Sequence, residues 1–429
     1  MKITTVGTGY VGLVTAALFA KLGNQVWGLD VDKKKIASLK SGKVPFYEPD
    51  LEDLVKENIK NKRLHFTSDY KKAVAQSEVV FICVGTPPKA DGDYDLQYIF
   101  ASAKQIARSL KKYTVIVIKS TVPPNTGSKV RKIMQKETKV SFDIASCPEF
   151  LREGSAVKDS LNPSRIVIGT ESNQAQEILL KLHKSIKAPR VLCDVVSAQL
   201  IKYAANAFLA TKISYINSIA LLCDKIGADI NKVSRGLGLD PRIGQAFLNA
   251  GLGYGGSCFA KDTSALVSFS KRQNYNFDFL KQVDQINKLQ IDYFVDKAEK
   301  LLGGSVKGKI ITVLGLSFKP NTDDMREARS IPIIEKLQKK GAEIRALDPV
   351  AIDNAKKTLK NVDYFKDPYK ALQTADALLL ITEWEEYAKL DFTKIKKIMR
   401  SPVIVDGRNF LPKEKLKKMG FSYEGVGTK

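Results

Sequence analysis

The chain has 429 residues, more than a single compact core usually supports, so two or three domains are expected. A hydrophobic fraction of 44% excludes extensive disorder. No apolar run approaches the roughly 20 residues of a membrane span, so we expect a cytoplasmic protein without a membrane partner. The formal net charge of +23 is compatible with nucleic-acid binding, but the lysines are scattered and no nucleic-acid motif accompanies them. Lysine-covered helix faces and no nucleic-acid partner are therefore the favoured interpretation.

The N-terminus combines a predicted strand, Lys2–Val6, with a GxGxxG motif and a predicted helix, Gly12–Leu22. In such a motif Gly7 permits a tight turn, Gly9 lets a pyrophosphate approach the backbone, and Gly12 lets the helix pack closely on the strand. The helix N-terminus then offers amide donors to phosphate. This combination predicts a dinucleotide-binding site.

The next predicted strand, Gln25–Leu29, ends in Asp30, close to the spacing expected of a carboxylate that binds the adenosine ribose. A carboxylate at this position repels a 2′-phosphate, so NAD is expected rather than NADP. Lys35 weakens that preference.

Further short apolar runs alternate with helical patterns such as Gln97–Leu110, which is typical of a parallel sheet. The runs are Val79–Val84, Thr114–Ile118, Phe142–Ser146 and Arg165–Ile168. Ligands bind beyond the carboxyl ends of such strands, which places Thr86 and Thr121 well for cofactor contact. The alternative is that these residues only cap loops.

The segment Cys147–Gly154 carries two carboxylates, Glu149 and Glu153, at positions i and i+4. On a helical turn both side chains would face the same cleft. An exposed acidic turn is the alternative.

A long helix is predicted from about Val196 to Gly227, a candidate spine between domains and a dimer contact, and another from about Asp278 to Leu302. Lys202 and Asn206 project together from the first helix, and a cation beside an amide donor is suited to stabilising an oxyanion. Two solvent-facing polar residues are the alternative.

The sharpest local feature is the loop GLGYGGSCFAKD at residues 251–262. Its glycines would let the backbone approach a ligand. A helix beginning at Ser257 or Cys258 would place the sulfur near a positive dipole end, which favours the nucleophilic thiolate. A buried structural cysteine is the alternative. The five cysteines lack any CxxC pair, so neither a disulfide framework nor a metal site is expected, and His65 and His183 are predicted to be ordinary strand and helix residues.

A second alternating block begins near residue 309, with predicted strands Ile310–Leu314, Glu343–Leu347, Ala377–Ile381 and Val403–Val405. The expected fold class is α/β, with two Rossmann-like domains joined by a long central helix and a helical middle domain. The expected boundaries are 1–195 for an NAD-binding domain, 196–304 for a central dimerisation domain with the cysteine loop, and 305–429 for a domain that binds the substrate.

Eight motifs, in order along nearly the whole chain, resemble the UDP-glucose/GDP-mannose dehydrogenase family. They are GTGYVG, CVGTP, KSTVPP, CPEFLREG, IKYAANAFLATKISYIN, GYGGSCFAKD, GLSFKPNTDDMREA and DGRNF. Ala260 and Asn125 depart from the usual family residues, which concerns loop geometry and not chemistry. The resemblance implies an NAD-dependent four-electron oxidation by a homodimer, with UDP bound by the C-terminal domain.

The resemblance also implies residue roles. For catalysis it implies Cys258 as nucleophile, Lys202 and Asn206 at the oxyanion, and Thr121, Glu149 and Asp262 for the water and proton transfers. For NAD it implies Gly7, Gly9, Val11, Gly12, Asp30, Lys35, Thr86, Thr121, Glu153, Lys261 and Arg326. For the sugar nucleotide it implies Glu149, Phe150, Leu151, Arg152, Glu153, Lys202, Asn206, Phe247, Leu248, Asn249, Ala250, Gly251, Tyr254, Gly255, Phe318, Lys319 and Arg408, with Arg242 reaching the partner subunit's substrate.

The expected reaction is oxidation of UDP-glucose to UDP-glucuronate through thiohemiacetal and thioester intermediates on Cys258. GDP-mannose or UDP-N-acetylmannosamine dehydrogenation on the same scaffold is the alternative within the class. A basic NAD-binding regulator or nucleic-acid-associated protein is the alternative from another class, but a regulator has no need of a nucleophile in the GGSCFAKD loop.

Overall fold

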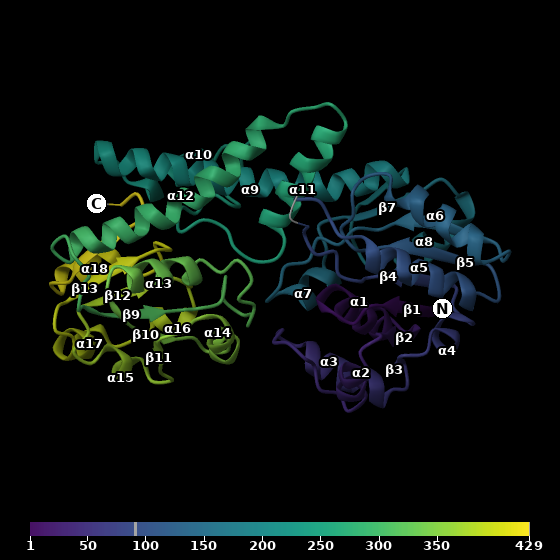
Figure 1. Cartoon of the computed structure of the whole chain (residues 1–429), viewed down its shortest axis with the longest axis horizontal. Coiled ribbons are helices and arrows are strands. Elements are labelled where there is room, and N and C mark those ends of the chain that lie inside the picture. Colours follow the sequence, from purple (N-terminus) through teal and green to yellow (C-terminus); the bar gives the residue numbers. More distant parts are fainter. Residues whose placement is uncertain (90–91, 429) are drawn as a thin grey trace. The chain divides into compact units, whose positions relative to one another are not determined.

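The computed structural model describes residues 1–89 and 92–428, and the chain divides into two units. Unit 1 consists of Met1–Ala205 and Ser268–Asn274, and unit 2 of Asn206–Val267 and the chain from Tyr275 onward. Each unit is built on a sheet with helices around it (Figure 1). No helix of the described residues is both long enough and apolar enough to cross a bilayer.

Unit 1 contains a sheet with the strand order β3-β2-β1-β4-β5-β6-β7-β8. The strands are β1 Lys2–Val6, β2 Gln25–Leu29, β3 Leu64–Thr67, β4 Val79–Ile82, β5 Thr114–Ile118, β6 Phe142–Ser146, β7 Ile166–Thr170 and β8 Arg190–Cys193. Neighbouring strands are parallel except for β6 and β7, which pair antiparallel. The sequence predicts a parallel sheet, so this reversal is a finding of the structure.

Helices of unit 1 connect these strands. They are α1 Tyr10–Lys21, α2 Lys33–Lys40, α3 Leu51–Lys60, α4 Tyr70–Val74, α5 Gln97–Ser109, α6 Thr126–Glu137, α7 Ala156–Leu161 and α8 Asn173–Leu182. Helix α1 is buried from Gly12 to Ala20, which its run of apolar and small residues permits on every side. It follows β1 directly, after the turn that contains Gly7 and Gly9.

Two helices contribute residues to both units: α9 Val195–Ile226 and α11 Phe259–Arg272. Helix α9 is continuous over 32 residues, as the absence of internal Pro and Gly predicts, and it begins one residue earlier than expected. The remaining helices before the second sheet are α10 Ile230–Gly238 and α12 Asp278–Leu301.

Unit 2 contains a parallel sheet with the strand order β11-β10-β9-β12-β13-β14. The strands are β9 Ile310–Leu314, β10 Glu343–Leu347, β11 Val362–Tyr364, β12 Ala377–Leu380, β13 Val403–Asp406 and β14 Ser422–Gly425. The associated helices are α13 Ser330–Lys339, α14 Ile352–Thr358, α15 Pro368–Leu372, α16 Glu385–Ala388, α17 Phe392–Ile398 and α18 Lys413–Lys418.

Every predicted strand is present, with ends shifted by two residues at most. Four short strands that the sequence did not predict, β3, β8, β11 and β14, complete the two sheets, and each lies at a sheet edge, two in each unit. The strand order reverses between β1 and β4 in unit 1 and between β9 and β12 in unit 2. In open α/β sheets, ligands bind beyond the carboxyl ends of the strands at such points.

One buried carboxylate organises the second sheet at this position. Asp348 follows β10 and is 4% exposed. Its Oδ2 accepts hydrogen bonds from the Leu316 and Ser317 amides and from the Trp384 indole, and its Oδ1 accepts from the Val350 and Ala351 amides. Asp348 stands after the second strand of its sheet, as Asp30 does in unit 1, but its oxygens are occupied by the protein's own loops.

We predict that Asp348→Asn lowers the free energy of unfolding by about 2–3 kcal/mol, because an amide NH₂ would face donors that now point at a carboxylate. Asp363→Asn on the exposed face of β11 is the control and should change stability by less than about 0.5 kcal/mol. Thermal unfolding of the full chain measures both. Equal melting temperatures for the two variants would contradict the assignment of Asp348 as the organising group.

Candidate active site

The glycine motif of unit 1 has the geometry that a dinucleotide requires. Gly7 has φ +94°, and a Cβ there would lie 2.8 Å from the Cys83 carbonyl oxygen. A Cβ on Gly12 would lie 1.8 Å from the Gly7 carbonyl oxygen, whereas a Cβ on Gly9 would meet nothing within 4 Å. Gly7 and Gly12 are therefore needed for the turn and for packing, and Gly9 leaves open space next to the backbone where a pyrophosphate fits.

A cavity of about 380 Å³ opens beside this motif, lined by Gly7, Gly9, Asp30, Lys35 and Tyr98 among others. The Asp30 Oδ2 accepts hydrogen bonds from the Thr8 amide at 2.9 Å and from Lys35 Nζ at 3.1 Å. Burial alone would raise the pKa of Asp30, but the hydrogen bonds from Thr8 and Asp32 and the charge of Lys35 lower it overall. The carboxylate is thus held ionised, which suits a ribose acceptor and fits NAD.

The two threonines at the strand ends of the same sheet are brought together. Thr86 Oγ1 donates to the Thr121 carbonyl oxygen at 3.0 Å, and Thr86 is 9% exposed. The contact joins the loops after β4 and β5, so both residues lie at the carboxyl ends of neighbouring strands as predicted.

Glu149 and Lys202 form a buried ion pair in unit 1. The Glu149 Oε1 to Lys202 Nζ distance is 2.7 Å, and the side chains are 9% and 5% exposed. Glu149 Oε2 also accepts the Leu151 amide at 2.8 Å, which bends the chain back on itself. The segment 149–153 is not helical, so the predicted helical turn with Glu149 and Glu153 on one face is wrong. The alternative of an exposed acidic turn is also wrong for Glu149, because its carboxylate is buried in the ion pair with Lys202.

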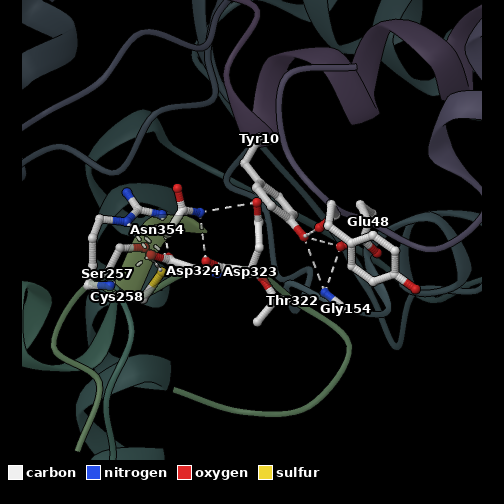
Figure 2. A network of polar contacts seen from close by, with 11 residues as sticks. Tyr10, Glu48, Gly154, Ser257, Cys258, Thr322, Asp323, Asp324 and Asn354 are labelled. Atoms are coloured by element: carbon white, nitrogen blue, oxygen red, sulfur yellow. Dashed lines mark hydrogen bonds and ion pairs between the residues drawn. The ribbon is translucent and has the colours of Figure 1, made fainter. Parts of the chain in front are cut away.

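A carboxylate that sequence reasoning missed, Glu48, holds the end of this segment. It is 5% exposed and accepts hydrogen bonds from the Gly154 and Ala156 amides at 2.6 Å each, and the Tyr10 hydroxyl also donates to it. Figure 2 shows Tyr10, Glu48 and Gly154 joined by these bonds. Tyr10 lies within the glycine motif, so Glu48 links the predicted phosphate loop to the segment that begins with Glu149. No sequence signal marks Glu48, because its partners lie 106 and 108 residues away.

In unit 2, Cys258 is exposed and directly precedes α11, and its carbonyl oxygen accepts the Asp262 amide at 2.8 Å. The helix therefore begins one residue later than the latest predicted start, and the sulfur still lies at its N-terminus. Ser257 Oγ lies 3.6 Å from the Cys258 sulfur (Figure 2). All five cysteines lie in the described part of the chain and are free, but burial raises the pKa of Cys83 and of Cys147 to about 12. Cys258 is the cysteine placed to react.

Asp262 is buried on the first turn of α11 and joins two predicted site residues. Its Oδ2 accepts Asn206 Nδ2 at 2.6 Å and its Oδ1 pairs with Lys261 Nζ at 2.7 Å. Asn206 is 6% exposed, so the alternative of a solvent-facing residue is wrong for it, as it is for Lys202. Because α9 is continuous, Lys202 and Asn206 are one helical turn apart, and each is held by a carboxylate.

The glycines of the cysteine loop have a packing role. A Cβ on Gly255 would lie 2.4 Å from the Glu327 carbonyl oxygen, and one on Gly256 would lie 2.6 Å from the Phe318 ring. Gly251 is similarly close to the Gly407 carbonyl oxygen, at 2.7 Å. The chain itself fills the space beside these glycines. They let the loop pack on the segments after β9 and β13, so packing alone already requires glycine at these three positions.

Side-chain amides fix the same loop. Asn287 Oδ1 accepts the Tyr254 amide at 2.8 Å and Asn287 Nδ2 donates to the Tyr254 carbonyl at 3.1 Å, so one side chain brackets one residue. Asn217 Oδ1 accepts the Gly251 amide at 2.8 Å. Neither asparagine was predicted, because each acts from a helix more than 30 residues away.

Arg408 is brought to this loop by a buried carboxylate. Asp406 accepts hydrogen bonds from the Arg408, Phe410 and Leu411 amides and from the Tyr423 hydroxyl. Arg408 then contacts the Gly253 and Phe318 carbonyl oxygens at 3.4 Å and pairs with Glu383 at 3.2 Å. The predicted residues Gly251, Tyr254, Gly255, Phe318, Lys319 and Arg408 thus cluster at the carboxyl ends of β9 and β13.

Other predicted residues contact neighbours outside these two clusters. Arg242 is exposed and pairs with Asp240 at 2.6 Å, and Arg326 pairs with Asp324 at the same distance. Arg152 pairs with Asp159, and Phe150 lies under the Arg165 guanidinium. In the 247–250 stretch Leu248 and Ala250 are buried, Phe247 is half-buried and Asn249 is exposed, while Val11 and Glu153 are half-buried in unit 1.

The histidines have structural roles. Burial lowers the pKa of His183 to about 4, and its Nδ1 contacts the Leu179 carbonyl at 2.8 Å. His65 lies against the Trp27 ring. Among the described residues no cluster of His, Cys, Asp or Glu is arranged to hold a metal ion.

A dinucleotide-binding sheet, a second Rossmann-like sheet and an exposed cysteine at a helix N-terminus define an NAD-dependent oxidoreductase. Three models of one family match the chain: the NAD-binding domain of UDP-glucose/GDP-mannose dehydrogenases over residues 1–187, the central domain over 196–289 and the UDP-binding domain over 312–413. The chain belongs to the UDP-glucose/GDP-mannose dehydrogenase family.

Relatives match over the full length. The chain is 48% identical to UDP-glucose 6-dehydrogenase TuaD of Bacillus subtilis, covering 99% of this chain and 93% of that protein. It is 46% identical to a UDP-glucose 6-dehydrogenase of Rhizobium meliloti, covering 100% and 99%. Among solved structures, a UDP-glucose dehydrogenase from Pyrobaculum islandicum is 39% identical with a TM-score of 0.93, covering 100% of this chain and 98% of that one.

The two helix-side glycines of the motif give a matched pair of variants. Gly9 has φ −75°, which alanine adopts without strain, so Gly9→Ala should keep the wild-type melting temperature and weaken NADH binding because the methyl group occupies the pyrophosphate space. Gly12→Ala should lower the free energy of unfolding by at least about 3 kcal/mol, because its Cβ overlaps the Gly7 carbonyl. Fluorescence titration with NADH and thermal unfolding measure the two effects. NADH binding of wild-type strength by Gly9→Ala would contradict the assignment.

Proposed function

We propose that the chain oxidises the primary alcohol of UDP-glucose to the carboxylate of UDP-glucuronate, with Cys258 as covalent catalyst. The observation that carries the proposal is the single exposed sulfur at the N-terminus of α11, in a chain similar over its whole length to named UDP-glucose 6-dehydrogenases. Bound NAD supplies the hydride acceptor, and two NAD molecules are required for each sugar. The residues described above hold it at the Gly7–Gly12 motif and Asp30.

The role of Cys258 follows from the need to retain the aldehyde between the two oxidations. The thiolate adds to the aldehyde carbon, a C–S bond forms, and the carbonyl oxygen takes a proton to give a thiohemiacetal. Loss of the remaining hydride and of the hydroxyl proton then gives a thioester. Water adds to the thioester carbonyl, the C–S bond breaks, and the acid is released with the thiol restored. The helix N-terminus favours the thiolate that begins the sequence.

Lys202 and Asn206 are proposed to stabilise the oxyanion that forms at the same oxygen in several of these steps. Their positions are fixed in advance, Lys202 by Glu149 and Asn206 by Asp262. Such preorganisation lets donors act without reorientation when the charge develops. Asp262, or a water molecule that it holds, is the proposed general base, with Thr121 and Glu149 assisting the water and proton transfers.

For substrate binding we propose the cluster around Gly251, Tyr254, Phe318, Lys319 and Arg408 as the UDP site. The second sheet carries no GxGxxG after β9, and Asp348 has its oxygens filled by its own loops, so a second dinucleotide is disfavoured there. A nucleotide that needs cations and backbone donors instead fits this cluster.

The stoichiometry of the reaction tests the proposal. With UDP-glucose and NAD, the wild-type chain should form two NADH for each sugar consumed, measured by absorbance and by product analysis. Cys258→Ser should lose at least about 100-fold in turnover to the acid while it retains UDP-glucose binding. Cys193→Ser, a half-buried cysteine in β8, is the control and should behave as wild type.

Three results would contradict the proposal. One NADH for each sugar would indicate a simple alcohol dehydrogenase. Faster turnover of GDP-mannose or UDP-N-acetylmannosamine in the same assay would favour the alternative substrates. Wild-type rates in Cys258→Ser would remove the covalent scheme.

We further propose a homodimer located in the cytoplasm, formed through α9. In unit 2 this helix exposes large apolar side chains at heptad spacing, Phe208 at 65%, Tyr215 at 53% and Leu222 at 50%. Exposed apolar side chains in such a row are typical of a protein interface. In the dimer, Arg242 would reach the partner subunit's substrate, as the family resemblance implies.

The double substitution Phe208→Glu with Tyr215→Glu should convert the dimer to a monomer, because charges would be buried in an apolar interface. Light scattering after size-exclusion chromatography measures the mass. The control is Leu289→Glu, which places a charge on an exposed leucine of α12. A wild-type protein that is monomeric at micromolar concentration would contradict the proposal.

A further inference from the structure

A buried arginine in unit 2 forms no salt bridge and no side-chain hydrogen bond with the described residues. Arg329 directly precedes α13 and is 6% exposed, and its Nε is buried without a hydrogen-bond partner. Within residues 1–89 and 92–428 the guanidinium forms no salt bridge at 4.0 Å or less. A buried cation without an ion pair lowers the stability of a folded protein. An anionic ligand that pairs with it would offset that cost.

The carboxylates near Arg329 act on it without forming an ion pair. Burial lowers the pKa of Arg329, while Glu327 and Asp284 act to raise it and the charge of Arg408 acts to lower it. Asp284 is paired with Lys288 at 2.7 Å, and a second carboxylate of this region, Glu383, is paired with Arg408. Glu327 lies two residues away with φ +51°, and its carbonyl oxygen is packed against Gly255.

A second buried polar atom without a partner lies in the same surroundings. The Tyr254 hydroxyl is buried and makes no hydrogen bond with any described residue, and burial raises the pKa of Tyr254 well above its usual value. The two side chains interact electrostatically. A guanidinium without an ion pair and a hydroxyl without a hydrogen bond together form a donor set for an anion with several oxygens.

The position of Arg329 in the sheet favours a ligand at this place. The residue ends the segment 315–329 that follows β9, which also carries Phe318 and Lys319. Strand order reverses between β9 and β12, and open α/β sheets bind ligands beyond the carboxyl ends of strands at that point. Guanidinium groups bind phosphate through paired N–H donors, so a phosphate group satisfies the charge and the geometry together.

We propose that Arg329 and the Tyr254 hydroxyl bind the diphosphate of the nucleotide sugar, so that the substrate provides the ion-pair partner that no described carboxylate provides. The inference rests on the proposed function, because the anion is the diphosphate of that substrate. It adds Arg329 to the site. It also implies that Arg329 lowers the free energy of unfolding of the ligand-free protein, and that bound diphosphate restores it.

The experiment compares Arg329→Met with wild type in the full-length protein, using UDP and uridine as separate ligands. The variant should bind UDP at least about 30-fold more weakly, because truncating one partner of a buried charge pair commonly has an effect of this size. Inhibition by uridine, which has no phosphate, and NADH binding should be unchanged. Ligand-free Arg329→Met should melt at the wild-type temperature or above it, and UDP should raise its melting temperature less than it does in wild type.

Two further variants complete the design. Lys339→Met removes an exposed positive charge from α13 and should leave UDP binding unchanged, which controls for net charge. Arg329→Lys keeps the charge without the paired donors and should recover part of the UDP affinity. Tyr254→Phe should weaken UDP binding with no loss of melting temperature, since its hydroxyl has no partner in the chain.

The outcomes separate this inference from the proposed function. Wild-type UDP affinity in Arg329→Met overturns the inference, and so does a variant too unstable to purify, since Arg329 is then a structural cation beneath the Tyr254 turn. In either case oxidation of UDP-glucose by the wild-type chain leaves the proposed function standing. A wild-type chain that neither binds UDP nor oxidises UDP-glucose overturns both.

Discussion

A carboxylate that folding removes from water must accept several hydrogen bonds, and this requirement shapes several loops of the candidate site. Glu48 takes two amides and a hydroxyl, Glu149 takes Lys202 and an amide, and Asp406 takes three amides and a hydroxyl. Most of the amide donors lie in loops. Each carboxylate therefore fixes a loop that neither helix nor strand could fix.

These anchors explain how donors can be in place before substrate arrives. Lys202 and Asn206 would be costly to bury alone, but each has a carboxylate partner within its own unit. The same arrangement restricts their rotamers, so little entropy is left to lose in the reaction. Arg329 differs from Lys202 and Asn206 because no carboxylate of the described residues forms an ion pair with it.

Much of the fold follows from periodicity and glycine placement. The strands from Lys2–Val6 to Val403–Asp406 are apolar runs bounded by turn residues, and α9 is a long apolar-periodic segment without helix breakers, so local signals suffice for them. Strands β3, β8, β11 and β14 are short and partly polar, as in Arg190–Cys193, and they exist because a sheet already offers them an edge. Tertiary context, which a single segment does not contain, decides such cases.

The candidate site divides along the same line. Asp30, Thr86, Cys258 and Asp262 lie in motifs where residue type and spacing carry the chemistry, and they were predicted. Glu48, Asn217 and Asn287 hydrogen-bond residues distant in sequence and carry no local signal. Three of the glycines at 251–256 are also required by packing, since a Cβ there would meet the protein's own backbone or side chains.

The hydrogen bonds that Asp348 accepts after β10 bear on which nucleotide the second sheet can bind. Two halves with the same topology would ordinarily compete for the same adenine nucleotide, and an abundant coenzyme would then obstruct the substrate. With its acceptors committed to Leu316, Ser317 and Trp384, Asp348 offers nothing to a ribose. The repeated topology therefore does not bring with it a second carboxylate free to bind a ribose.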